Sequence, residues 1–370
     1  MRRGTIVLFI FGLVALGIIA ASTLLQNQPP IEITVAVDPL IEEWARASVS
    51  QFNEQGVVVG AGRRVHVNLS VIPDVDVWAE ISPWNGASHP DAWLPSSNAS
   101  LTYAEERALP FVTVSPSLAK TVLIWAGFSE RVNILTDSET APLNWSLVQG
   151  AAEEESWQAL GGQASWQFFK LAFNQPSDAL TGIGAVLTAA AEFSDTATPS
   201  GAQLTSSEFR QWMRPVFEAV NFTIGSDIAA ITASRGTSVV DVAIAPESQW
   251  LRNLTALSQR GEIRFSEPEY LFVFDFPLTR WEDAQTAQDV RSAVDALGRF
   301  LQAAPQQNLL TTYGLRPASR SVTQADTLFA QAEAMGLPLN RDLSEANTAI
   351  IQPPTLTDIR TLLSWISNIR

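Results

Sequence analysis

The residues best suited to bind a small molecule lie where a predicted strand meets a predicted helix. Ser96, Ser97 and Asn98 follow the apolar stretch 92–94 and precede the helix-forming residues 101–109. Their side chains can accept hydrogen bonds from the unpaired N–H groups of a helix start, or contact a polar ligand held there. In an open α/β sheet, ligands bind at such junctions. The sequence leaves capping alone and capping with ligand contact open, and we predict that all three residues bind ligand.

Similar junctions supply further candidates, each with a simpler structural interpretation. Trp93 ends the strand before Ser96, and an aromatic face can stack on a sugar or a cation, with core packing as the alternative. Glu247 and Ser248 follow the strand pattern 239–245. An acidic group there can bind a cation, amine or hydroxyl, or act as a first-turn helix charge. The full predicted ligand-binding set is Asp38, Trp93, Ser96, Ser97, Asn98, Ser115, Ser177, Glu247, Ser248 and Tyr270.

The chain lacks the residues and motifs that usually carry out catalysis or bind metals. Cysteine is absent, which excludes disulfides, thiolate zinc ligands and a thiol nucleophile. The only histidines, His66 and His89, leave little material for a metal site. No Gly-x-Ser-x-Gly, His-Glu-x-x-His or phosphate-binding loop motif occurs. We therefore predict no catalytic residue, no metal, no cofactor and no enzyme activity. A hydrolase that uses His89 and Glu247 is a distant third interpretation.

The composition is that of a folded, acidic protein. Hydrophobic residues make up 46% of the chain and charged residues 16%, so a sizeable core is expected. The formal net charge is −15. Because no basic stripe offsets this charge, we predict no nucleic-acid partner.

The N-terminus predicts export. Arg2 and Arg3 precede residues 5–25, which carry no charge. This length is close to the ~20 apolar residues of a spanning helix and exceeds the core of a signal peptide. The positive-inside rule would keep the arginines in the cytoplasm and place the rest of the chain outside. We predict a single-pass signal anchor in the cell membrane, with secretion after cleavage near residues 20–22 as the alternative.

The rest of the chain alternates strand and helix patterns, which predicts an α/β fold. The patterns at 31–37 and 65–72 flank a helix that opens at Asp38, so these two strands should be parallel. Ser177 lies at the start of a later helix.

Two crossings are expected to divide the chain into two lobes with separate sheets. One is the extended segment 110–116, which contains Ser115, and the other lies near 274–277, close to Tyr270. The predicted divisions are 1–30 for the transmembrane helix and spacer, 31–115 plus 275–345 for lobe 1, 116–274 for lobe 2, and 346–370 for a C-terminal helix.

Five segments together resemble a known family, the bacterial extracytoplasmic solute-binding proteins of the type II periplasmic-binding kind. The resemblance is strongest to the substrate-binding domain found on membrane-anchored von Willebrand factor A domain proteins. It implies a two-lobe fold in which each lobe is a mainly parallel sheet flanked by helices. The segments that carry it are residues 90–97, 114–117, 241–247, 270–277 and 313–317.

The first strand-helix loop departs from the family pattern. Related oxyanion binders usually place a serine there, whereas this chain has Asp38 followed by Pro39. A carboxylate in that loop would repel a divalent oxyanion.

The resemblance predicts a membrane-anchored, outward-facing protein that traps a small polar ligand between two lobes. Its expected partners are a small-molecule solute, an ABC-type permease or another membrane protein, and the membrane itself through the N-terminal helix. A ligand-less structural or protein-interaction module of the cell envelope with the same fold is the alternative. The departure at Asp38 favours this alternative slightly.

Overall fold

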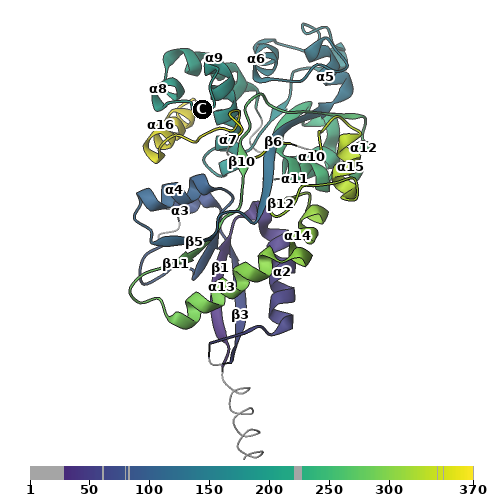
Figure 1. Cartoon of the computed structure of the whole chain (residues 1–370). Coiled ribbons are helices and arrows are strands. Elements are labelled where there is room, and N and C mark those ends of the chain that lie inside the picture. The colour runs from purple at the N-terminus through teal and green to yellow at the C-terminus, as the bar shows by residue number, and fades with distance from the viewer. Residues whose placement is uncertain are drawn as a thin grey trace, which may run out of the picture.

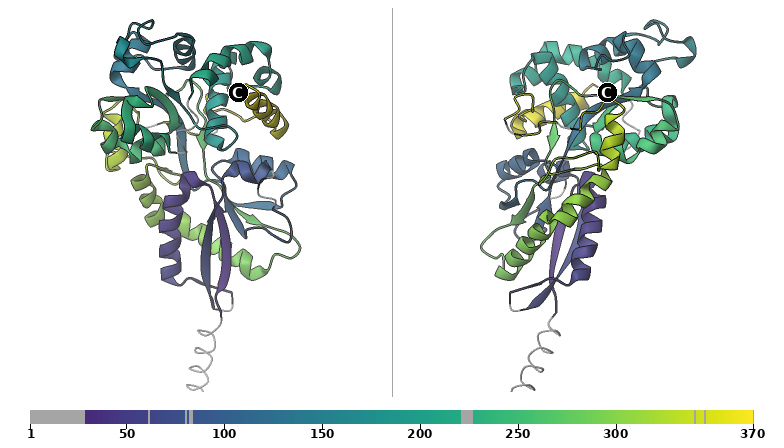
Figure 2. Two further views of the ribbon diagram at one scale, coloured as in Figure 1. Left: turned by 180° about the vertical axis from the view of Figure 1, so that it is seen from behind. Right: turned by 45° about the vertical axis from the view of Figure 1, so that its right-hand side comes forward.

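The computed structural model consists of two lobes, each built on its own β-sheet (Figures 1 and 2). It describes residues 29–60, 62–79, 81, 84–220, 227–339, 341–344 and 346–369. The predicted two-lobe α/β architecture is confirmed. In Figure 1 the first lobe is the lower one and the second lobe is the upper one.

The first lobe contains a six-stranded sheet in the order β2-β3-β1-β4-β11-β5. β1 runs parallel to β3, as predicted, and also to β4, while β2 and β11 run antiparallel to their neighbours. The strands are β1 (Ile31–Val37), β2 (Val58–Val59), β3 (Arg63–Val71), β4 (Ala92–Leu94), β5 (Phe111–Ser115) and β11 (Leu278–Trp281). The helices are η1 (Pro39–Ile41), α2 (Glu42–Gln55), α3 (Asp74–Trp78), α4 (Asn98–Glu106), α13 (Gln288–Gln302), α14 (Ala304–Leu310) and η5 (Thr311–Tyr313).

Local signals explain where the first helical segment of this lobe, η1 followed by α2, begins and ends. The Asp38 side chain accepts a hydrogen bond from the Leu40 N–H at 2.9 Å, and Pro39 supplies a first residue that has no N–H to satisfy. Gly56 ends α2 in the left-handed region at φ 58°, where a side chain would be strained.

The second lobe is organised around β6, the longest strand of its sheet. The main path of the sheet is β10-β6-β8-β7, and β9 and β12 also pair with β6. The strands are β6 (Ala119–Phe128), β7 (Leu171–Ala172), β8 (Val242–Pro246), β9 (Ile263–Ser266), β10 (Val273–Phe274) and β12 (Arg316–Pro317). The helices are α5 (Ser129–Thr136), α6 (Trp145–Glu153), η2 (Ala164–Trp166), α7 (Leu180–Ser194), α8 (Gly201–Leu204), α9 (Ser207–Ala219), α10 (Ile228–Arg235), η4 (Gly236–Ser238), α11 (Glu247–Arg252), α12 (Leu254–Ser258), α15 (Thr327–Glu333) and α16 (Leu356–Ser367).

The prediction of a mainly parallel sheet is wrong for the second lobe. β6 is antiparallel to β8, β9, β10 and β12, and among the named strands of the described residues only β7 and β8 form a parallel pair in this sheet. The physical reason is that a strand buried on both faces is a continuous apolar run, whatever the direction of its neighbours. The sequence of β6 therefore identifies the strand but not its pairing.

The C-terminal part of the chain also differs from the predicted division. The prediction places residues 275–345 in lobe 1, but β12 pairs with β6 of lobe 2. Farther along the chain, the Ile351 N–H donates to the Leu271 carbonyl at 2.9 Å. The chain thus returns to the second lobe from Arg316 onward, because the ten-residue β6 leaves its first residues free to pair with β12.

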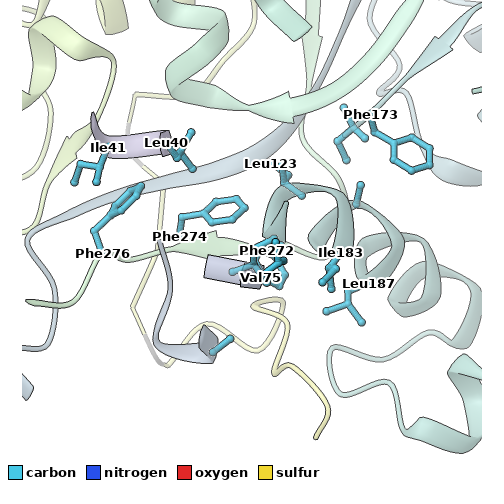
Figure 3. Close-up of a cluster of buried hydrophobic side chains, with 14 of the residues drawn as sticks. Leu40, Ile41, Val75, Leu123, Phe173, Ile183, Leu187, Phe272, Phe274 and Phe276 are labelled. Atoms are coloured by element: carbon cyan, nitrogen blue, oxygen red, sulfur yellow. The ribbon is translucent and has the colours of Figure 1, made fainter. Parts of the chain in front are cut away.

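The hydrophobic core is continuous between the lobes at the crossing strands (Figure 3). Phe272, Phe274 and Phe276 lie on the connection from the second sheet to the first, and each is almost fully buried. They gather beside first-lobe residues such as Leu40 and second-lobe residues such as Ile183. The crossing between the lobes is therefore a packed apolar region.

The predicted transmembrane helix is corrected. None of the helices in the described part of the chain is both long and apolar enough to cross a membrane. The longest of them, α7 and α13, have 15 residues each, fewer than the ~20 that a bilayer requires. The segment on which the prediction fell lies within residues 1–28, outside the described residues.

Candidate functional site

A cavity of about 420 Å³ lies between the two lobes. Its first-lobe wall comes from the loop after β1, the start of α2, the residue before α3 and the loop after β4. Its second-lobe wall comes from the segment that leads into α7, the N-cap of α10 and the helix α11. The polar side chains that line it are those of Asp38, Glu42, Glu43, Ser96, Asn174, Asp178, Thr181, Asp227, Gln249 and Arg252.

Two buried carboxyl groups organise the first-lobe wall. Asp74 Oδ2 accepts hydrogen bonds from the Ser96 N–H at 2.8 Å, from Ser96 Oγ at 2.7 Å and from Ser100 Oγ at 2.7 Å. Asp38 Oδ2 accepts from the Asp74 N–H at 3.1 Å. Asp74 therefore fixes the position of Ser96, which faces the cavity.

The proximity of these two carboxyl groups changes their protonation. Burial raises the pKa of Asp38, and burial together with the negative charge of Asp38 raises the pKa of Asp74 well above its usual range. Hydrogen bonds from Ser96 and Ser100 lower the pKa of Asp74, but they do not outweigh its burial. Because two buried like charges repel strongly, the pair tends to hold one proton.

The second-lobe wall is held by close backbone packing. Thr181 Oγ1 donates to Asn174 Oδ1 at 2.8 Å, which links the end of β7 to the start of α7. A Cβ atom at Gly182 would lie 2.3 Å from the Asn174 carbonyl oxygen, so only glycine allows this approach. Gly184 also packs closely, since a Cβ atom there would lie 2.9 Å from Phe272 and 3.0 Å from Leu123.

Charge across the cavity is predominantly negative. Five acidic residues line it against a single arginine, Arg252. Arg252 joins the lobes, since Nη1 lies 3.1 Å from Oε2 of Glu43 in the first lobe and Nη2 lies 3.7 Å from Oδ2 of Asp227 in the second. The Glu43 side chain is 63% exposed, so this ion pair contributes no more than about 1 kcal/mol. Across the cleft, burial and then the charge of Asp178 raise the pKa of Asp76.

Of the ten residues predicted to bind ligand, the structure places Asp38 and Ser96 in the wall of this cavity. Ser97 caps α4 by accepting from the Ala99 N–H at 3.2 Å. Asn98 donates its backbone N–H to Asp275 Oδ1 at 2.8 Å, and its side chain donates to Asp275 and to the Pro116 carbonyl. Both segments that Asn98 joins are crossings between the lobes.

Two more of the predicted residues make local contacts at other crossings and loops. Ser115 Oγ donates to the Ser117 carbonyl at 3.1 Å. Ser177 is exposed and donates to Asp178 Oδ1 at 2.7 Å, so it touches the cavity only through its neighbour.

The other four predicted residues lie away from the cavity. Trp93 is fully buried in an aromatic cluster with Trp84 and Phe111. Tyr270 donates to Asp195 Oδ1 at 2.8 Å on the second lobe, and this contact raises its pKa to about 12.

Glu247 belongs to a buried ion-pair cluster. Its two carboxylate oxygens each accept from Arg316 at 2.8 Å, and Arg341 lies 3.6 Å away. Burial alone would raise the pKa of Glu247, but Arg341 and Arg316 outweigh it and lower the pKa. Ser248 is buried beside it and donates its N–H to Thr121 Oγ1 at 3.1 Å. Glu247 and Ser248 therefore have structural partners in the second lobe.

From residues 174–181 of the second-lobe wall, the predicted ligand-binding set contains only Ser177. Asn174, Asp178 and Thr181 carry a usable signal, since they surround a strand-to-helix junction like that at Ser96. Asp227 and Arg252 carry none, because an N-cap and a last-turn arginine are ordinary features of surface helices. Within the described ranges, no group of three or more His, Cys, Asp or Glu side chains is arranged to hold a metal ion.

Comparison of the chain with known proteins gives matches at the level of structure. No protein-family model matches it, and no curated protein matches it in sequence. The sulfate-binding protein SubI from Mycobacterium tuberculosis H37Rv is similar, with a TM-score of 0.53 and 15% identity over 89% of this chain and 96% of that one. A periplasmic thiamin binding protein has a TM-score of 0.59 and 11% identity, with 92% and 96% covered. Maltose-bound MalE3 from T. maritima has a TM-score of 0.60 and 11% identity, with 92% and 95% covered.

The chain has the fold of a periplasmic substrate-binding protein. At these identities the likeness concerns the fold alone, so the sulfate, thiamin and maltose of the relatives do not transfer to this chain. The absence of enzyme activity stays a prediction. The narrower resemblance to domains of von Willebrand factor A proteins stays a prediction.

Proposed function

We propose that this protein is an extracytoplasmic solute-binding protein that holds a small polar molecule between its lobes. The observation that carries the proposal is the interlobe cavity of about 420 Å³, lined from both sides by residues at strand ends and helix starts. Its volume lies within the ~300–1,000 Å³ of small-molecule sites. Two lobes joined by crossing strands also allow hinge closure around a ligand.

The charge of the cavity favours some ligands over others. Five acidic side chains against one arginine give the cavity an excess of negative charge, which disfavours an oxyanion. Carboxylates with no positive neighbour attract cations and accept hydrogen bonds from hydroxyl groups. We therefore propose that the solute carries amine or hydroxyl groups.

The place of action and the partner follow from the same proposal. The basic start and the uncharged stretch 5–25 support export of the folded part to the extracytoplasmic side. A reporter enzyme fused after residue 369, active only outside the cytoplasm, tests this. Delivery of the solute to an ABC-type permease is the expected next step, and cross-linking in the native host tests for that partner.

A thermal-unfolding screen tests the binding function. The full chain is heated with amines, uncharged sugars and inorganic oxyanions; a solute at 100 times its Kd should stabilise the fold by about 2.7 kcal/mol. Asp178→Asn should reduce that effect, because Asp178 lines the cavity and is exposed. Asp137→Asn is the matched control, an exposed aspartate at the end of α5, outside the cavity.

The outcomes of this screen separate the candidate functions. Equal loss of the effect in both variants would place the binding site elsewhere. If no solute stabilises the protein while a stable protein partner co-purifies with it, the ligand-less interaction module is the better account.

A further inference from the structure

The last helix of the described chain contacts both lobes. Figure 1 shows α16 between α8 of the upper lobe and α3 and α4 of the lower lobe. Its apolar residues Leu356, Ile359, Leu362 and Ile366 are buried in the large hydrophobic core. α16 is therefore part of the folded structure, and it touches both lobes.

Its attachment to the second lobe is extensive. Just before the helix, the Gln352 N–H donates to the Ala197 carbonyl at 2.9 Å. Near its end, the Trp365 ring packs edge-on against Phe217 with centroids 5.5 Å apart. In between, α16 approaches the start of α8 so closely that a Cβ at Gly201 would meet the Asp358 carboxylate. The segment is thus fixed to the second lobe at both ends and in the middle.

Its contacts with the first lobe include three hydrogen bonds. Tyr103 Oη donates to the Pro354 carbonyl at 3.0 Å, and Arg360 Nη2 donates to the Trp78 carbonyl at 3.2 Å. The Leu356 N–H donates to Glu106 Oε1 at 3.4 Å. On the α16 side, all three contacts come from residues 354–360, which are the two residues before the helix and its first five positions.

We propose that α16 is a strap that travels with the second lobe and holds the lobes together through the contacts of residues 354–360. The proposal rests on the two-lobe motion of the proposed function, and it adds a contact that limits how readily the lobes open. Opening the cleft breaks the hydrogen bonds of Tyr103, Arg360 and Glu106, while the Trp365 contact stays intact. The exposed ion pair of Arg252 is the weaker of the two interlobe ties, because solvent screens it.

Distance measurements between the lobes test the strap. The chain has no cysteine, so Gln158→Cys on lobe 2 and Gln302→Cys on lobe 1, both exposed, carry spin labels specifically. The strap variant is Tyr103→Phe with Arg360→Met in the labelled full chain. The control, Arg299→Met, removes an exposed guanidinium group from α13 of the first lobe, away from α16.

Without ligand, the strap variant should show roughly a tenfold larger population at long distance, since two hydrogen bonds of ordinary strength are lost. The control should match the unmodified chain. Overlap of the strap variant with the unmodified chain, or an equal shift in the control, would overturn the proposal.

Hydrogen exchange on the unmodified chain keeps the strap testable if the strap variant does not fold. The Leu356 N–H, bonded to the first lobe, should exchange faster than the Gln352 N–H, bonded to the second. Equal protection of both would overturn the strap. A solute that closes the lobes equally in every variant would overturn the strap and leave the proposed binding function intact.

Discussion

Replacing Asp74 by asparagine should change how the stability of the protein depends on pH. Asp74 is fully buried, lies beside Asp38, and holds Ser96 and Ser100 through its Oδ2 atom. An asparagine can keep the hydrogen bonds to the two serines through its carbonyl oxygen. Its amide replaces the proton that the carboxyl pair otherwise retains, and it does not titrate.

The sign and size of the effect follow from the raised pKa of Asp74. A group whose pKa is higher in the folded state than in the unfolded chain stabilises the fold below its unfolded pKa, about 3.9. That stability is lost as pH rises through the folded pKa. Each unit by which burial and the Asp38 charge raise the pKa therefore costs about 1.4 kcal/mol once both carboxyl groups are ionised. The difference between the variant and the natural chain should grow from pH 4 upward.

Urea unfolding at a series of pH values from 4 to 8 measures this difference. The free energy of unfolding of Asp74→Asn should exceed that of the natural chain increasingly toward pH 8. Asp137→Asn serves as the control, because this exposed residue has no part in the carboxyl pair. Burial also raises the pKa of Asp241 and Asp275, but both variants keep these groups, so they cancel. Parallel curves for Asp74→Asn and the natural chain would refute the reasoning.

Three further substitutions separate structural residues from residues of the site. Glu247→Gln should lower the free energy of unfolding by ~3–5 kcal/mol, because it leaves buried Arg316 with an uncompensated charge; unchanged urea midpoints would contradict this. Trp93→Ala should lower the free energy of unfolding by ~3–5 kcal/mol. Under conditions where the variant is fully folded, its solute affinity should be unchanged, and a loss of affinity in calorimetry would contradict the placement of Trp93 in the core. Arg252→Met should change stability by less than ~1 kcal/mol, since its partner Glu43 is exposed. It should also raise the calorimetric preference for amines over oxyanions, and an unaltered preference would exclude a role of Arg252 charge.

Local signals in the sequence predicted the first lobe well. Alternating residues in β1 and β3 and the Asp38-Pro39 helix start depend only on neighbours in the chain, and β1 and β3 pair in parallel as expected. The second sheet was harder, because a fully apolar strand such as β6 is compatible with either direction of pairing.

The difference between local signals and contacts between distant residues also explains which residues of the site could be predicted. The strand-to-helix junction rule led to Asp38 and Ser96, because such junctions gather at the end of a sheet. It also led to Glu247, whose partner Arg316 is 69 residues away and has no signature in the local sequence. A carboxylate that lines a cavity and one that neutralises a buried arginine look alike until the fold brings their partners together.

The most direct test of the central claim is a crystal structure of the chain soaked with the tightest solute from the unfolding screen. The account predicts density for the solute in the cavity of about 420 Å³, in contact with Asp38 or Ser96 on one side and with the Asn174 to Thr181 segment on the other. Density confined to the separate cavity beside Lys120 and Arg320, with the space between the lobes filled only by solvent, would contradict it.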